Sequence, residues 1–334
     1  MHDAAPAVDV SVVIVNWNTP GLLADCLRSL RRCGGVTSEV IVVDNGSTDG
    51  SPDLVRKHFP EVRLIANENN LGFAKANNQG FAAACGRYLL VLNSDTVVPA
   101  DAPARLVAYA DAHPDAGMVG PRLLNADGSL QWSSADLPTL PRELLGVLGR
   151  RRRRLPGTDA AFAVGWLAGA CILVRRAAWE QVGGFDEAFF MYSEDTDWCR
   201  RMHAAGWGVV YLADVSVTHL GSGSAPLHSP TQLERLYDAK VRYFTRHHGP
   251  AAGEWLRRGL VVTRGLGLLR RVVVYPLHRR AEARARARAE LAARWHLVRF
   301  LKRRRPTPHV PHYGPTPTLV QQPEAIAVGA PTPS

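Results

Sequence analysis

Short apolar runs that alternate with helical stretches are the feature of this sequence that most constrains its fold. Val, Ile and Leu dominate the apolar runs, which cover residues 10–18, 39–45, 62–70 and 88–95. Residues 19–33 and 71–85, between them, space their apolar side chains as a helix does. Strands that alternate with helices form parallel sheets covered on both faces. The sequence therefore predicts an α/β fold with a doubly wound, mostly parallel sheet.

Polar residues end three of these predicted strands. In chain order they are Asn16 to Asn18, Asp44 with Asn45, and Asn93 to Asp95. Ligands of open α/β sheets bind beyond the carboxyl ends of the strands. The alternative is that a carboxylate at a strand end only caps the turn that follows, because Asp and Asn favour turns. Three such ends at one edge favour a ligand site over three separate caps.

The side chains at this edge suit a nucleotide diphosphate and a metal ion. Asp44 can accept a hydrogen bond from the imide N–H of uracil or thymine. Asp95, with Asn93 on the same side of the extended chain, offers the oxygen ligands that Mg²⁺ prefers. The stretch NLGFAKANNQG, residues 70–80, predicts a helix start whose free N–H groups face a phosphate, with Lys75 adding charge.

An acidic cluster and one histidine follow further along the chain. The sequence SEDTDWCRR holds Glu194, Asp195 and Asp197 together. Acids are common at helix starts because the helix dipole favours them. A carboxylate that faces a cleft can also serve as a general base toward a hydroxyl group. His219 precedes a glycine-serine loop, and either a structural or a metal-binding role fits it.

The net charge of +10 is concentrated in one segment. Residues 254–305 hold sixteen Arg and Lys against three Glu, while the rest of the chain is slightly acidic. Leu, Val, Trp and Phe are interleaved with Arg there, as in helices that lie in a membrane interface. Two alternatives are a solvated basic helix packed on the core and nucleic-acid binding. Nucleic-acid binding leaves the acids at the strand ends unexplained.

The cysteines and the N-terminus favour a cytosolic protein, and the basic segment is expected to hold it on the inner face of the cell membrane. The five cysteines are odd in number and form no close CxxC pair, which favours reduced thiols. The N-terminus lacks a secretory signal pattern, and no apolar run approaches the roughly 20 residues that span a bilayer.

We expect four parts: a tail (1–8), a catalytic domain (9–230), a basic amphipathic helical region (231–305) and a disordered Pro-rich tail (306–334). Residues 149–159 are expected to form a mobile loop.

Taken together, DNGSTDGS, NLGFAKANN, LNSD, GACILVRR and YSEDTDWCRR resemble glycosyltransferase family 2 in their order and spacing. The resemblance covers about residues 9–222. It implies the GT-A fold, a nucleotide-sugar donor, Mg²⁺ or Mn²⁺ as cofactor, and inversion at the anomeric carbon. Within the family, NLGFAKANN and the asparagine-first NSD look most like bacterial rhamnosyltransferases.

The resemblance also implies roles for individual residues. Asp44 matches the base-binding aspartate, Asp95 the metal ligand and Asp195 the catalytic base. Glu194 is expected to support that base or to touch the acceptor. His219 falls where some members place a further metal ligand, whereas Asn93 departs from the usual first aspartate of the metal motif. The other residues expected to contact the donor are Asn16, Asn18, Asn70, Gly72, Lys75, Asn78, Asn93 and Ser94. Those expected to contact the acceptor are Trp166, Gly169 and Ala170.

The expected activity is transfer of L-rhamnose from dTDP-rhamnose to a cell-envelope glycan or a polyprenyl-diphosphate-linked acceptor. UDP-linked galactofuranose, N-acetylglucosamine or glucose is the alternative donor. Nucleic-acid binding through the Arg-rich segment is a remote alternative. The expected partners are the donor, the acceptor and an anionic membrane surface.

Overall fold

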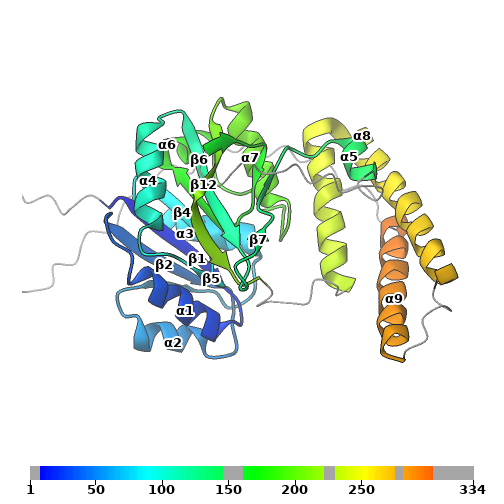
Figure 1. Cartoon of the computed structure of the whole chain (residues 1–334), viewed down its shortest axis with the longest axis horizontal. Coiled ribbons are helices and arrows are strands. Elements are labelled where there is room, and N and C mark those ends of the chain that lie inside the picture. Colours follow the sequence, from blue (N-terminus) through cyan, green and yellow to red (C-terminus); the bar gives the residue numbers. More distant parts are fainter. Residues whose placement is uncertain (1–7, 146–160, 222–229, 275–280, 304–334) are drawn as a thin grey trace, which may run out of the picture.

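A computed structural model describes residues 8–145, 161–221, 230–274 and 281–303. The expected tails, the loop at 149–159 and the glycine-serine residues after Gly221 lie outside these ranges. A central sheet with helices on both faces is joined to a separate helical layer (Figure 1). This arrangement confirms the predicted α/β class and the mostly parallel sheet.

Four parallel strands form the N-terminal half of the sheet, in the spatial order β3-β2-β1-β4. They are β1 (Val10–Asn16), β2 (Ser38–Asp44), β3 (Arg63–Ala66) and β4 (Tyr88–Asn93). Asn16 lies in register with Asp44, and Val15 lies in register with Asn93. The polar ends of β1, β2 and β4 therefore meet at one edge, as the sequence predicted. β3 is shorter than the predicted run at 62–70.

The other half of the sheet mixes directions. Its strands are β5 (Thr96–Val97), β6 (Ala116–Leu124), β7 (Leu130–Gln131), β9 (Ala161–Ala163), β11 (Cys171–Arg175) and β12 (Gly208–His219). β11 runs antiparallel between β4 and β6, whereas β6 and β12 are parallel. β5 pairs antiparallel with β12 and sets Thr96 opposite His219. A small second sheet joins β8 (Ser134–Ala135) to β10 (Trp166–Leu167).

Alternating side chains of the strands build a core on each face of the sheet. Val12 and Ile14 of β1 pack with Leu23 and Leu27 of α1 (Pro20–Leu30), while Val13 points to the other face. This alternation is the period of two expected of a strand covered on both sides. The remaining helices that cover the sheet are α2 (Ser51–His58), α3 (Phe73–Ala83), α4 (Ala102–Ala112), α6 (Arg176–Val182) and α7 (Glu194–Ala204).

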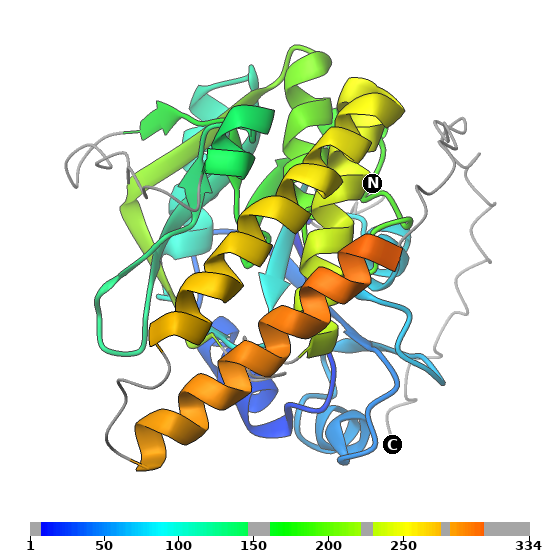
Figure 2. The same ribbon diagram turned by 90° about the vertical axis from the view of Figure 1, so that its right-hand side faces the viewer.

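Three further helices form the layer beside the sheet: α5 (Leu140–Leu145), α8 (Pro230–Val274) and α9 (Ala281–Arg303). α8 is kinked at Gly249, whose φ of 88° is not helical and which precedes Pro250. α8 and α9 run side by side (Figure 2). Their apolar faces share a core with Phe189, which lies in the segment before α7. The helices expected at 231–305 thus pack directly on the segment that leads into the acidic cluster.

No helix in the described ranges is both long enough and apolar enough to cross a bilayer. All five cysteines are free thiols, and Cys26, Cys171 and Cys199 are buried.

Candidate active site

A buried hydrogen-bond network joins the ends of β1 and β2. The Nδ2 group of Asn16 donates to Oδ2 of Asp44 at 3.0 Å, and both residues are buried. The backbone N–H of Ser47 donates to Oδ1 of the same carboxylate at 2.8 Å. Asn18 has a φ of 53° and accepts from the N–H of Thr48 at 2.9 Å. The carboxylate is therefore held in one orientation at the sheet edge.

Thr19 links this network to the end of β4. Its hydroxyl donates to Oδ1 of Asn16 at 2.7 Å and lies 3.2 Å from the hydroxyl of Ser94. The predicted donor residues Asn16, Asp44 and Ser94 therefore belong to one connected edge. Thr19 was not among the predicted site residues, because a threonine after an Asn-Trp-Asn turn carries no signal of its own.

A second network shapes the turn before α3. The Nδ2 group of Asn45 donates to Oδ1 of Asn70 at 3.0 Å, and Asn70 accepts from the N–H of Gly72 at 2.9 Å. Gly72 has φ 88° and ψ 168°, a conformation that is almost exclusive to glycine. A Cβ atom there would lie 2.6 Å from the carbonyl oxygen of Phe190. Glycine is therefore required where this turn meets the segment before α7.

The other two candidates on α3 differ in their surroundings. Lys75 is exposed. The side-chain amide of Asn78 donates to the carbonyl of Phe185 at 2.9 Å and accepts from its N–H at 2.9 Å. Asn78 thus fastens α3 to the loop after α6, and its amide is occupied by protein atoms.

Asp95, His219 and Asn93 converge just beyond β4. The Nε2 atom of His219 lies 3.1 Å from Oδ1 of Asp95 and 3.2 Å from Nδ2 of Asn93. The pairing of β5 with β12 brings them together, since the N–H of Leu220 also donates to the carbonyl of Asp95 at 2.9 Å. Within the described ranges, no group of three or more His, Cys, Asp or Glu side chains gathers as a metal site. One carboxylate and one imidazole, completed by the diphosphate oxygens of a substrate, are nevertheless a donor set that fits Mg²⁺ or Mn²⁺.

Gln131 contacts this group from β7 and was missed by the sequence analysis. Its Oε1 atom lies 2.6 Å from Nδ1 of His219. The sequence shows only a DG turn near it, and Gln131 and His219 lie 88 positions apart in the chain, so the contact cannot be read from the sequence.

Asp195 lies in the first turn of α7 and faces the turn before β11. Its Oδ2 atom accepts from the N–H of Gly169 at 3.1 Å, and Oδ1 accepts from the N–H of Thr196 at 2.6 Å. Burial raises the pKa of Asp195, while the indole of Trp166 and these N–H groups oppose that rise. The indole N–H of Trp166 is buried without an acceptor in hydrogen-bonding geometry among the described residues. The predicted acceptor residues Trp166 and Gly169 therefore adjoin the predicted base.

Ala170 completes a bridge between the turn before β11 and the end of β4. Its carbonyl oxygen accepts from the N–H of Asn93 at 2.9 Å, while the preceding residue, Gly169, donates to Asp195. Two successive residues thus connect the carboxylate of Asp195 to the end of β4.

The three acids of the cluster occupy different environments. Glu194 is buried, and its Oε2 atom has no partner among the described residues. Burial raises the pKa of Glu194 well above its ordinary value, and the charge of Asp195 adds to the rise. This environment favours the protonated form of Glu194.

Asp197, in contrast, is a structural anchor. It is fully buried and lies 2.8 Å from Nε of Arg201, 3.3 Å from Nε of Arg246 and 2.7 Å from Nε2 of His247. Burial acts to raise the pKa of Asp197, but His247 and the two arginines outweigh burial and lower it. Because Arg246 and His247 belong to α8, this cluster fastens α8 to the helix that carries Asp195.

A family model described as "Glycosyl transferase family 2" matches residues 11–183. The N-acetylglucosaminyl-diphospho-decaprenol L-rhamnosyltransferase of Mycobacterium tuberculosis is 33% identical over 277 residues, which cover 76% of this chain and 90% of that protein. Among solved structures, the mannosyltransferase PcManGT from Pyrobaculum calidifontis, in complex with GDP-Man and Mn²⁺, has a TM-score of 0.51 at 17% identity, and the match covers 87% of this chain and 85% of that one. GalNAc-T7, crystallised with UDP, GalNAc and Mn²⁺, has a TM-score of 0.52 at 17% identity, with coverage of 72% of this chain and 48% of its own. These likenesses establish the GT-A fold for the sheet and its helices.

Proposed function

This chain belongs to glycosyltransferase family 2, and we propose that it transfers L-rhamnose from dTDP-rhamnose to a lipid-linked acceptor of the cell envelope. One observation carries the catalytic part of the proposal. Gly169 and Ala170 join a buried carboxylate, Asp195, to the strand end that bears Asn93 and Asp95. A general base and a diphosphate site must adjoin each other for an acceptor hydroxyl to attack the sugar.

In the proposed reaction the donor lies along the edge formed by β1, β2 and β4. Asp44, oriented by Asn16 and Ser47, accepts a hydrogen bond from the imide N–H of the nucleobase. Asp95 and His219 would hold Mg²⁺ or Mn²⁺, and the positive charge of the bound ion would stabilise the departing diphosphate. The solved structures of PcManGT and GalNAc-T7, which contain Mn²⁺, support a divalent metal in this fold.

The acceptor approaches from the side of Asp195. Asp195 takes the proton from the acceptor hydroxyl as the oxygen attacks the anomeric carbon opposite the diphosphate. One such displacement inverts that carbon, and no enzyme nucleophile takes part. Trp132, which is 64% exposed and whose ring lies 5.5 Å from that of Trp166, offers an aromatic surface for the acceptor. The indole of Trp166 opposes the rise in the pKa of Asp195 and so helps to keep the proposed base ionised.

The rhamnosyl specificity rests on the relative from M. tuberculosis, whose name specifies a rhamnosyl group and an acceptor on decaprenyl diphosphate. The identity of 33% across 90% of that protein supports the same substrate classes for this chain. A UDP-sugar is the second candidate donor, because uracil carries the same imide N–H as thymine and Asp44 would accept from either.

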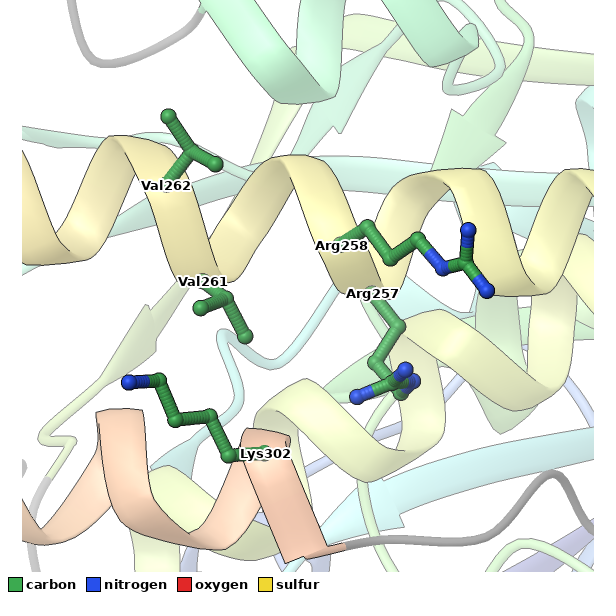
Figure 3. Close-up of a pocket in the computed structure, with 5 residues that line it drawn as sticks. All are labelled: Arg257, Arg258, Val261, Val262 and Lys302. Atoms are coloured by element: carbon green, nitrogen blue, oxygen red, sulfur yellow. The ribbon is translucent and has the colours of Figure 1, made fainter.

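A lipid-linked acceptor requires the enzyme to reach a membrane, and the outer faces of α8 and α9 suit one. Large apolar side chains of α8 are exposed along one stripe: Trp255, Val262, Leu266, Leu269 and Val272. On α9, Trp295 is exposed beside basic residues such as Arg299 and Lys302. A hollow of about 350 Å³ lies between α8 and α9, and in it the side chain of Lys302 from α9 points toward Val261 of α8 (Figure 3).

Apolar side chains that alternate with basic ones are typical of helices that lie in an interface and attract anionic lipid. We therefore propose that this α8–α9 surface binds the anionic inner leaflet of the cell membrane.

The test of the proposed function is a donor comparison with the purified full-length chain. dTDP-rhamnose, UDP-galactofuranose, UDP-N-acetylglucosamine and UDP-glucose would be offered in turn with Mg²⁺ and with N-acetylglucosaminyl-diphospho-polyprenol, and the lipid product quantified. Of the four donors we expect only dTDP-rhamnose to give product, and only when the acceptor is present. Product from a UDP-sugar alone would overturn the rhamnosyl assignment and leave the family and fold intact.

A further inference from the structure

The hairpin that joins β6 to β7 forms a chain of side-chain hydrogen bonds that ends on His219. Gln131 lies 2.6 Å from Nδ1 of His219 through its Oε1 atom. Its Nε2 group donates to Oδ1 of Asn125 at 3.0 Å and to the carbonyl of His219 at 3.3 Å. Asn125 in turn donates to the hydroxyl of Ser129 at 2.9 Å, and Ser129 donates to Oδ1 of Asp127 at 2.6 Å.

The direction of each bond in this chain follows from its outer end. The carboxylate of Asp127 can only accept, because the N–H and the hydroxyl of Ser129 lower its pKa and keep it ionised. The Ser129 hydroxyl therefore donates a hydrogen bond to Asp127 and accepts one from Asn125. The Asn125 oxygen then faces Gln131 and accepts from its Nε2 group. The oxygen of Gln131 is left facing His219, and it can only accept.

We infer that Gln131 is a positioning residue that keeps Nδ1 of His219 protonated and so directs Nε2 toward Asp95. A proton is required at Nδ1, because two acceptors 2.6 Å apart would repel each other. With Nδ1 occupied, Nε2 is the nitrogen left to bind a cation. The effect of this tautomer on metal binding rests on the proposed function. The tautomer itself rests only on the contact between Gln131 and His219.

The neighbours of Nε2 do not fix the tautomer by themselves. Asn93 presents an amide donor at 3.2 Å, which favours a lone pair on Nε2. Asp95 presents an acceptor at 3.1 Å, which favours a proton on the same atom. Since these contacts oppose each other, the contact with Gln131 decides which nitrogen carries the proton in neutral His219. Second-shell hydrogen bonds of this kind commonly fix the tautomer of metal-binding histidines.

The experiment compares full-length wild type with Gln131→Met and Gln131→Glu. Methionine has a similar shape but no strong acceptor, whereas glutamate restores an acceptor beside Nδ1. Gln181→Met is the matched control, because Gln181 accepts from the indole of Trp207, outside this hairpin. The first readout is the ¹⁵N spectrum of metal-free protein labelled at histidine, with the His219 signals identified by their loss in His219→Gln. It is recorded about two pH units above the ordinary imidazole pKa of about 6.5.

We expect a protonated Nδ1 in wild type, Gln131→Glu and Gln181→Met, and a proton moved to Nε2 in Gln131→Met. The second readout is Mn²⁺ affinity by electron paramagnetic resonance, which should weaken about 10- to 100-fold in Gln131→Met only. An unchanged His219 tautomer in Gln131→Met would overturn the inference. If wild type has the expected tautomer but binds no Mn²⁺, the metal site of the proposed function fails and the role of Gln131 in the tautomer stands.

Discussion

The Oδ2 atom of Asp195 accepts a hydrogen bond from the backbone N–H of Gly169 at 3.1 Å. The carbonyl of the following residue, Ala170, accepts from the N–H of Asn93 at 2.9 Å. Backbone groups, rather than long side chains, thus set the separation between the proposed base and the proposed metal site. A fixed separation of this kind places two reacting groups before the substrate binds, which lowers the entropic part of the barrier.

The raised pKa of Asp195 predicts the acidic limb of the pH–rate profile. A base acts only when deprotonated, and burial moves the pKa of Asp195 above its ordinary value of 3.8. The kcat/KM for the acceptor should therefore begin to fall at a higher pH than an unperturbed aspartate would give. A profile of kcat/KM against pH, with donor saturating, measures this limb. A limb at or below the ordinary value would contradict Asp195 as the base.

Glu194 should make folding stability fall as pH rises. Its folded pKa lies well above 4.5, so the stability tied to its proton is fully present below 4.5 and is lost as pH rises through the folded pKa. Between those two values the unfolded state has released a proton that the folded state retains, which costs about 1.4 kcal/mol per pH unit. Glu194→Gln removes the titration, so its stability relative to wild type should grow with pH.

Urea unfolding of both proteins at several values between about pH 5 and pH 8 measures the difference, within the range where proteins are usually most stable. Glu180→Gln, a substitution outside the acidic cluster, serves as control and should run parallel to wild type. A constant difference between Glu194→Gln and wild type would show that Glu194 does not titrate as its environment indicates.

Gly72→Ala should destabilise the protein and weaken donor binding. Its φ of 88° and ψ of 168° are nearly closed to alanine, and the new methyl group would lie 2.6 Å from the carbonyl oxygen of Phe190. Strain of this kind costs about 1–3 kcal/mol. Gly21→Ala, in α1, is the control, because a Cβ there meets no atom within 4 Å. Urea unfolding and the donor KM check both substitutions; equal stability of the two variants would contradict the account of this turn.

Leu266→Glu with Leu269→Glu should release the enzyme from anionic vesicles. These leucines are 62% and 63% exposed, so the substitutions should leave the fold intact. Burying one leucine contributes about 1.5–3 kcal/mol, so the pair should weaken vesicle binding by at least about 100-fold. Co-sedimentation with vesicles of anionic and of neutral lipid measures binding, with Ala82→Glu on α3 as the charge control. Unchanged sedimentation of the double variant would show that this stripe does not contact lipid.

Much of the site could be predicted because parallel strands end at one edge of a sheet. The pattern of apolar runs placed Asn16, Asp44 and Asn93 together, and the register of β1 with β2 and β4 bears this out. Asp95 and His219 meet because of a two-residue strand, β5, that no sequence pattern indicated. Their neighbourhood was proposed from the family resemblance alone.

The parts that sequence reasoning missed depend on long-range packing. Gln131 reaches His219 from a hairpin whose only signal is a DG turn. The acidic cluster did not show which acid faces the site, because that choice depends on Arg246 and His247, which pair with Asp197 from α8. Asn78, expected to contact the donor, has its amide engaged by Phe185, a loop residue more than 100 positions away.

The central claim, that this edge and Asp195 form one site for glycosyl transfer, is tested most directly by Asp195→Asn. The measurement is a single-turnover transfer from dTDP-rhamnose to N-acetylglucosaminyl-diphospho-polyprenol, together with the Kd for the donor. Asp214→Asn, a surface substitution that breaks an exposed pair with Arg105, is the matched control. We predict that Asp195→Asn slows transfer by about 10²–10⁴-fold with an unchanged donor Kd, while the control keeps full activity. Wild-type transfer rates in Asp195→Asn would contradict the claim.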